Sequence, residues 1–257
     1  MRWNVDIHRP RKGAPVTLTR ARIALLSFIL LICATQAFAV PALQLGITDG
    51  IYVPNNDPID GGTTFATSNP FTLNAYLNPS KASSDDFYFL SMAIVPKVST
   101  PSVLGNFTFT YLGTTTTVNV TSNMIYGIPP IETLVTPNTA IKDPGDLSRH
   151  GIFETYFYEY KFQFNPNVFV SPRINVQDGT TEPGKLYLRE FQINVAGLDP
   201  AYSVHFDLYN EKLACRSTTD LDINLFAPFS HDAQSNGHQV PEPATLVLLG
   251  TGLTGLS

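Results

Sequence analysis

The sequence predicts an all-β protein: a single-domain, antiparallel β-sandwich of jelly-roll or immunoglobulin-like topology spanning residues 40–229. Apolar and polar residues alternate with a period of two, as in strands with one buried face. Clusters of Pro, Gly and Asn separate these runs, and almost no stretch keeps a helical period. Eight to ten short strands of this kind favour a sandwich, with a closed barrel as the main alternative.

The first expected strands differ in how many apolar faces they have. Residues 71–77 carry one apolar face, formed by Phe71, Leu73, Ala75 and Leu77. Residues 87–95 are apolar on both faces, as expected for a strand at the centre of a sheet. Two Thr-rich runs, 106–111 and 115–120, flank Leu112-Gly113-Thr114 and predict a hairpin.

The clearest strand is 156–164, which has an aromatic face and a largely charged face. The aromatic face consists of Tyr156, Tyr158, Tyr160, Phe162 and Phe164. Burying one large apolar side chain contributes about 1.5–3 kcal/mol, so five contribute on the order of 10 kcal/mol. We therefore expect this face in the core and the opposite face, with Glu159 and Lys161, in solvent.

Three further strands are expected in residues 187–195, 204–208 and 220–226, with a turn at 196–200. His205 and Asp207 lie on the face of the second strand opposite its apolar residues. We expect them to form hydrogen bonds at the surface, with metal binding as the alternative.

The N-terminal residues have the pattern of a secretory signal peptide. Arg20 and Arg22 precede an apolar run, 23–34, which is followed by Ala37-Phe38-Ala39. A basic flank, a short apolar core and small residues at the cut site predict cleavage between Ala39 and Val40 by signal peptidase. Residues 1–39 are thus assigned to the signal peptide and excluded from the fold.

The C-terminal residues have the composition of a targeting segment rather than of a folded domain. A polar linker, 230–239, leads to Val240, Pro241, Glu242 and Pro243, and then to a nearly uncharged apolar run. Residues 240–257 resemble the PEP-CTERM sorting signal of bacterial exported proteins. The resemblance implies recognition by a membrane-embedded exosortase, transient membrane anchoring, and a location at the cell surface or in the extracellular matrix.

The apolar run is short and lacks a basic tail. Such signals end in arginines, whereas the last basic residue here is Arg216. At ~1.5 Å per residue, a helix over 244–256 spans about 20 Å, against a hydrocarbon core of about 30 Å. We expect either that the basic tail is missing from the sequence or that the segment is a transient handle for processing.

The predicted domain carries a second resemblance, spread over most of its length. The segments that carry it are residues 42–45, 67–73, 150–153, 205–210 and 226–233. They resemble the exported choice-of-anchor N family, whose name records that a similar ectodomain is joined to different surface-attachment tails. The resemblance implies an exported or surface location and no particular chemistry.

Charge and cysteine content narrow the function classes. Residues 1–39 contain six of the sixteen Lys and Arg residues but only Asp6 of the twenty-one acidic residues, so ten basic and twenty acidic residues follow. Nucleic acid is therefore not an expected partner. Cys33 lies in the signal peptide, so Cys215 has no partner for an intrachain disulfide in the mature chain.

We expect no enzymatic activity and no catalytic residues. The chain has no Gly-x-Ser-x-Gly elbow, phosphate-binding loop, His-Glu-x-x-His motif or paired-cysteine metal motif. Cys215 near His205 is a weak pattern for a thiol nucleophile, and we interpret Cys215 as structural. Two functions remain: a structural or adhesive protein of the surface or matrix, or, alternatively, a carbohydrate-binding module.

Candidate ligand positions are of two kinds, and no cofactor is expected, with Ca²⁺ as the alternative. Oxygen-rich residues at loop or alternate spacing are candidate calcium ligands: Asn55, Asp57, Asp60, Asp220, Asp222 and Asn224. A plain turn for the first three and a solvent-facing strand for the last three are the favoured interpretations. For a matrix polysaccharide, the candidate stacking rings are Tyr52, Tyr76, Tyr202 and Tyr209, since the one Trp, Trp3, is in the signal peptide.

Overall fold

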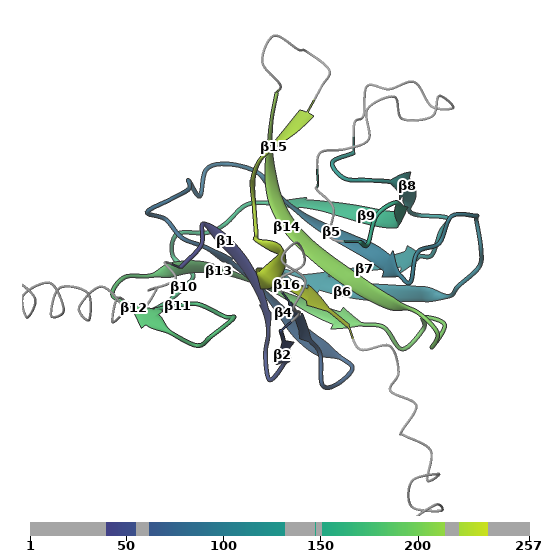
Figure 1. Cartoon of the computed structure of the whole chain (residues 1–257), viewed down its shortest axis with the longest axis horizontal. Coiled ribbons are helices and arrows are strands. Elements are labelled where there is room, and N and C mark those ends of the chain that lie inside the picture. The colour runs from purple at the N-terminus through teal and green to yellow at the C-terminus, as the bar shows by residue number, and fades with distance from the viewer. Residues whose placement is uncertain (1–39, 55–61, 132–146, 148–150, 214–220, 236–257) are drawn as a thin grey trace, which may run out of the picture. The chain divides into compact units, whose positions relative to one another are not determined.

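The computed structural model describes residues 40–54, 62–131, 147, 151–213 and 221–235, which form strands in two packed sheets (Figure 1). The chain divides into residues 1–39 and 40–257, and all described residues belong to the second unit. The predicted β-sandwich is confirmed. The helical content of the described segments is one short 3-10 turn, η1 (Phe229–His231).

The first sheet has the strand order β1-β4-β13-β6-β7, with β10 beside β13. Every pair in it is antiparallel. The strands are β1 (Leu43–Ile47), β4 (Phe71–Leu77), β6 (Asn106–Tyr111), β7 (Thr114–Asn119), β10 (Phe169–Val170) and β13 (Leu186–Asn194).

The second sheet has the order β2-β3-β16-β14-β5-β9-β8, with β15 also beside β14. It is antiparallel except for the parallel pair β16 and β3. Its strands are β2 (Ile51–Val53), β3 (Thr63–Phe65), β5 (Tyr88–Val95), β8 (Ile125–Gly127), β9 (Thr155–Phe162), β14 (Ser203–Leu213), β15 (Leu221–Phe226) and β16 (Asp232–Gln234). A separate small hairpin pairs β11 (Arg173–Ile174) with β12 (Thr181–Glu182).

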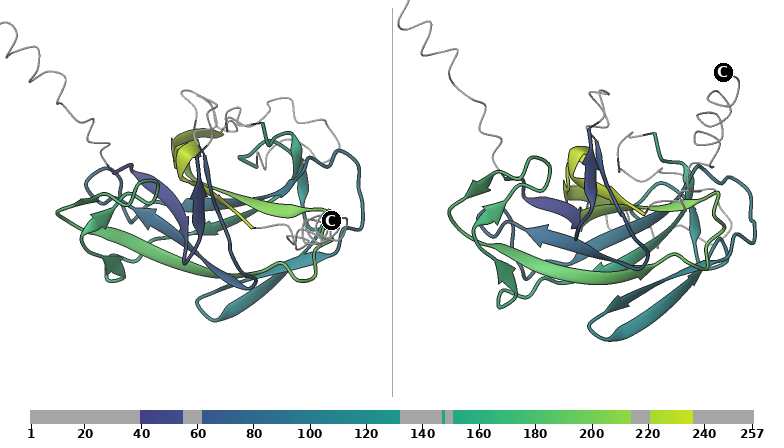
Figure 2. Two further views of the ribbon diagram at one scale, coloured as in Figure 1. Left: turned by 60° about the horizontal axis from the view of Figure 1, so that its bottom comes forward. Right: turned by 90° about the horizontal axis from the view of Figure 1, so that it is seen from below.

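Aromatic side chains from both sheets meet in the core between them. The rings of Phe71 (β4) and Phe206 (β14) lie 6.1 Å apart, centroid to centroid. Those of Phe162 (β9) and Phe191 (β13) lie 5.3 Å apart, nearly perpendicular. In the two views of Figure 2, β13 and β14 lie in separate layers. Because these pairs bridge the layers, the aromatic residues fix how one sheet sits on the other.

The apolar patterns of β4 and β5 match their positions. The four apolar residues of β4 predicted to face the core are all buried. β5 is buried over seven of its eight residues and lies between β14 and β9, as its two apolar faces predict. Phe87, expected at the start of this strand, precedes it instead and is 50% exposed.

The predicted hairpin is confirmed in β6 and β7. Its two-residue loop, Leu112 and Gly113, has φ values of 48° and 79°. Two positive φ values in succession are typical of the turn that matches the twist of paired strands. Glycine adopts this conformation freely, whereas Leu112 has a Cβ that opposes it.

The aromatic strand β9 is confirmed, but its second face is not fully solvent-exposed. Phe162 and Phe164 are buried, and the three tyrosines of the same face pack against the core. On the opposite face Phe157 is buried and Glu159 is half-buried. Sequence alternation assigns a side chain to a face but does not show what covers that face.

Part of the outer face of the second sheet is covered by a smaller cluster. Phe89, Leu147 and Tyr209 are its buried members, and Ile128, Phe153, Ile223 and Phe229 pack against them. Several of these residues come from connections rather than strands, which is why the period of the strands did not predict this burial.

The predicted linker, 230–239, begins inside the fold. β16 lies between β3 and β14, and Ala233 is fully buried. Ser235 continues the attachment: its N–H donates to the Val204 carbonyl at 2.8 Å, and its Oγ accepts from the Val204 N–H at 2.8 Å. A polar segment becomes a strand here because strands on both sides satisfy its backbone groups. The folded region therefore extends at least to Ser235 rather than ending at residue 229.

Candidate functional site

A buried ionisable cluster lies where β14 meets β16. β14 places His205 and Asp207 on one face, and β16 brings Asp232 beside them. His205 Nε2 lies 3.5 Å from Asp207 Oδ1 and 3.4 Å from Asp232 Oδ2, and His205 Nδ1 lies 3.4 Å from Gln234 Oε1. The surface position expected for His205 and Asp207 is wrong, since they are 1% and 4% exposed.

The two carboxylates control the charge of His205. Burial, the largest single effect, opposes the charged form, but Asp232 and Asp207 together raise the pKa of His205 to about 9. The imidazole is therefore protonated at neutral pH and held between two negative charges. This arrangement cross-links β14 to β16 electrostatically.

The same atoms are close enough to share one metal ion. One ligand atom from each of the three side chains lies within 4.8 Å of the others, and among the described residues this is the one group of three or more His, Cys, Asp or Glu side chains with that property. A metal would bind only the neutral imidazole, so it would have to displace the proton that the carboxylates stabilise.

Of the six predicted calcium ligands, the two that the structure describes, Asp222 and Asn224, do not belong to this cluster. Asn55, Asp57, Asp60 and Asp220 lie outside the described residues. Asp222 and Asn224 lie on β15, and Asn224 is exposed, with its Nδ2 donating to Asn210 Oδ1 at 3.4 Å. Sequence reasoning did not connect Asp232 with His205 because strand pairing brings them together across 27 positions, which no local spacing indicates.

The four candidate stacking tyrosines do not form one platform. Tyr209 is fully buried, its ring stacks on Phe89 at 6.0 Å, and its hydroxyl donates to Glu159, so no ligand reaches it. Tyr52, Tyr76 and Tyr202 are half-buried and come from β2, β4 and a turn. Burial raises the pKa of Tyr76, helped by the charge of Glu190.

Glu159 is the half-buried acid that accepts the hydrogen bond of Tyr209. Burial raises the pKa of its carboxyl group, partly offset by hydrogen bonds from the Tyr209 hydroxyl and from the Ile131 N–H at 3.3 Å. The Tyr209 pKa is raised well above its usual value, first by burial and then by the Glu159 charge. The pair is a partly buried polar contact between β9 and β14.

An open groove on the second sheet brings an exposed aromatic ring together with charged and amide groups, which the four tyrosines do not. Its volume is about 520 Å³, and it is lined by Asp85, Asp86, Phe87, Phe89, Lys161, Asn210, Glu211, Lys212 and Asn224. The Phe87 ring is half-exposed and has Lys161 Nζ 4.0 Å from its centre. An aromatic face beside carboxylate, amide and ammonium groups can contact both the C–H face and the hydroxyl groups of a sugar.

A second hollow, of about 660 Å³, contains no ionisable acid or base among its lining residues other than Tyr156. It is formed by residues 101–103, 105, 106, 119–122 and 156, in which Ser, Thr and Asn side chains stand beside apolar ones. This composition offers hydrogen bonds but no charge. It is therefore a weaker candidate than the groove beside Phe87.

Comparison with known proteins adds a sorting motif. Residues 239–257 match the PEP-CTERM protein-sorting motif. This motif makes the chain an exported, surface-sorted protein that an exosortase processes. Within the described residues, no helix has the length and apolar character needed to cross a membrane. The sorting-signal residues, Val240 to Pro243, and the cleavage residues Ala37 and Ala39 lie outside the described residues.

Beyond the motif, the comparisons give little. No curated protein matches the chain. Among solved structures, it is similar to ACE19, the collagen-binding subdomain of the Enterococcus faecalis surface protein ACE, at 7% identity, covering 76% of this chain and 96% of that one. The TM-score is 0.23. A similarity at this level supports neither a shared topology nor a shared ligand.

Proposed function

We propose that this exported protein is a non-catalytic component of the cell surface or extracellular matrix, in which the sandwich acts as a structural or adhesive element. The observation that carries the proposal is the sorting motif at residues 239–257, which directs the chain to the surface. Signal peptidase and an exosortase are its transient partners. The resemblance of the ectodomain to the choice-of-anchor N family supports the same location.

The construction of the sandwich supports a load-resisting role. Aromatic pairs such as Phe71 with Phe206 bridge the two sheets, and the core requires no disulfide among the described residues. Long antiparallel pairs, β14 with β5 and β13 with β4, each match seven residues. Many such contacts hold the two sheets together and resist a change of shape.

Cell attachment tests the proposal. Strains that lack the protein, make it in full, or make it without residues 239–257 are compared for adhesion to a surface and for mass of extracellular matrix. We expect the full chain alone to restore both. Equal adhesion and matrix in all three strains would refute a structural or adhesive role.

The groove beside Phe87 favours a second candidate, a carbohydrate-binding module for matrix polysaccharide. A glycan array probed with the secreted protein tests it, with Phe87→Ala as the variant. Phe169 supplies a matched control, because it is also 50% exposed and has Lys185 Nζ 4.9 Å from its ring centre, yet it does not line the groove. Saturable binding lost in Phe87→Ala and kept in Phe169→Ala supports the module, and no saturable binding at all eliminates it.

A further inference from the structure

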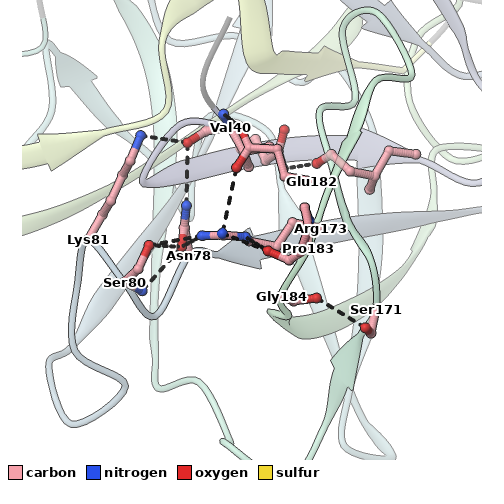
Figure 3. Close-up of polar contacts among 11 residues, drawn as sticks. Val40, Asn78, Ser80, Lys81, Ser171, Arg173, Glu182, Pro183 and Gly184 are labelled. Carbon is pink, nitrogen blue, oxygen red and sulfur yellow. Dashed lines mark hydrogen bonds and ion pairs between the residues drawn. The ribbon is translucent and has the colours of Figure 1, made fainter. Parts of the chain in front are cut away.

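Val40, the residue that follows the predicted cleavage site, lies in a pocket formed by polar side chains (Figure 3). It is 1% exposed. Its backbone nitrogen donates to Glu182 Oε1 at 3.1 Å. Its carbonyl oxygen accepts from Lys81 Nζ at 2.7 Å and from Asn78 Nδ2 at 3.4 Å. Both backbone polar groups of this one residue are thus met by side chains.

The groups around Glu182 fix its orientation. Arg173 Nη2 lies 3.6 Å from Glu182 Oε2, which leaves Oε1 directed at Val40. The same arginine donates to Asn78 Oδ1 at 3.2 Å, to Ser80 Oγ at 3.0 Å and to the Pro183 carbonyl. Arg173 therefore connects the β11–β12 hairpin to the turn after β4, and the pocket is held in place from two sides.

We propose that this pocket binds the mature N-terminus, with Glu182 as the counterion of the new α-ammonium group. Hydrolysis of the Ala39–Val40 amide consumes one water: Ala39 leaves with a carboxylate, and the Val40 nitrogen gains the protons that make it an ammonium. An α-ammonium with pKa about 8 is charged at neutral pH. The amide N–H of the uncleaved chain already makes a charge-assisted hydrogen bond to the Glu182 carboxylate, and cleavage adds a formal charge on the donor, so the contact becomes an ion pair.

Glu182 matters more after cleavage than before it. The pocket already contains the cations Arg173 and Lys81, with Glu182 as the carboxylate that contacts both Val40 and Arg173. Cleavage adds a third positive charge beside Lys81 and Arg173, and Glu182, which contacts the Val40 nitrogen, is placed to balance it. The amide of the uncleaved chain makes no such demand.

Docking of the terminus ties down the start of the first sheet. The Asn78 N–H donates to the Ala42 carbonyl at 2.8 Å, immediately before β1 pairs with β4. Removal of the signal peptide therefore converts the hydrogen bond from the Val40 N–H to Glu182 into an ion pair, and this ion pair anchors β1. The added stabilisation by this ion pair exists only in the processed form. The inference rests on the predicted cleavage after Ala39 and on export, but not on the structural or adhesive role.

The test compares melting temperatures of two forms of the mature chain. One begins at Val40 with a free amine, and the other has the same amine acetylated, which removes the charge without altering the sequence. Each form is made with Glu182, with Glu182→Gln, and with the control Glu190→Gln, an exposed acid outside the pocket. Edman sequencing of the exported protein identifies its first residue.

We expect the free amine to raise the melting temperature by about 2–4 °C over the acetylated form, the shift that about 1 kcal/mol produces in a domain of this size. The gap should vanish in Glu182→Gln and persist in Glu190→Gln. Equal melting of the two forms with Glu182 present, a gap that survives Glu182→Gln, or an exported chain that begins elsewhere than Val40 would overturn the proposal. None of these results bears on adhesion, so the proposed function is tested separately.

Discussion

Raising the pH from about 6.5 to about 9 is expected to destabilise the protein through His205, whose pKa rises across that interval on folding. Between these values the folded state holds a proton on His205 that the unfolded state has released. The stability contributed by Asp207 and Asp232 is thus complete below pH 6.5 and is lost as pH rises through about 9. The slope is about 1.4 kcal/mol per pH unit, so the whole window accounts for about 3 kcal/mol.

Chemical denaturation at a series of pH values measures this loss, which corresponds to roughly 6–12 °C in melting temperature at ~2–4 °C per kcal/mol. His205→Gln should be less stable at pH 6.5 and should lose most of the slope. His231→Gln is the matched control, because burial lowers the pKa of His231 to about 4 and its own pH effect lies below 6.5. An unchanged slope in His205→Gln would refute the assigned charge of the cluster.

Four other substitutions test the fold by equilibrium denaturation. Phe206→Ala removes a fully buried ring between the sheets and should cost about 3–5 kcal/mol, whereas a cost below about 1 kcal/mol would contradict the packing. Leu112→Asn should stabilise the hairpin by several tenths of a kcal/mol, since Asn tolerates the positive φ of 48° better, while Gly113→Ala should destabilise it; the opposite order would exclude this turn. Tyr209→Phe removes the donor to the Glu159 carboxyl and should lower the free energy of unfolding by about 1–3 kcal/mol. It should also raise the pKa of that carboxyl further. No change in either quantity would show that the contact is absent.

The strands that face a single core could be predicted from sequence. In β4 the period of two identifies the four buried apolar residues, because each is set by its own position along the strand, whereas the burial of Asn74 on the other face is not predicted. The central place of β5 follows from its two apolar faces. Both predictions depend on local information, and both are confirmed.

Features that depend on pairing over long distances could not be predicted in this way. β16 was assigned to a linker because its polar residues show no strand pattern, and the partners that make it a strand, β3 and β14, lie far away in sequence. For the same reason Asp232 was not connected with His205. The burial of Tyr209 depends on residues such as Leu147 that come from a connection and leave no periodic pattern.

The groove beside Phe87 was also missed, although its parts were visible. Asp85, Asp86 and Phe87 adjoin in sequence, but Lys161 and Asn224 reach the groove from β9 and from β15. Residue type alone identifies the four tyrosines as candidate stacking rings, whereas the exposure of a ring depends on which residues pack around it. Phe87 is exposed because the strand begins one residue later than its apolar pattern suggests.

Subcellular fractionation tests the central claim most directly, namely that the chain is delivered to the cell surface by its C-terminal motif. The amount of protein in the cytosol, the envelope and the medium is measured for the full chain and for a chain lacking residues 239–257. The account predicts that the full chain is held at the surface or in the matrix, without residues 1–39, and that the shortened chain is exported but not held there. Full-length protein in the cytosol with both ends intact, or the same distribution for both chains, would contradict it.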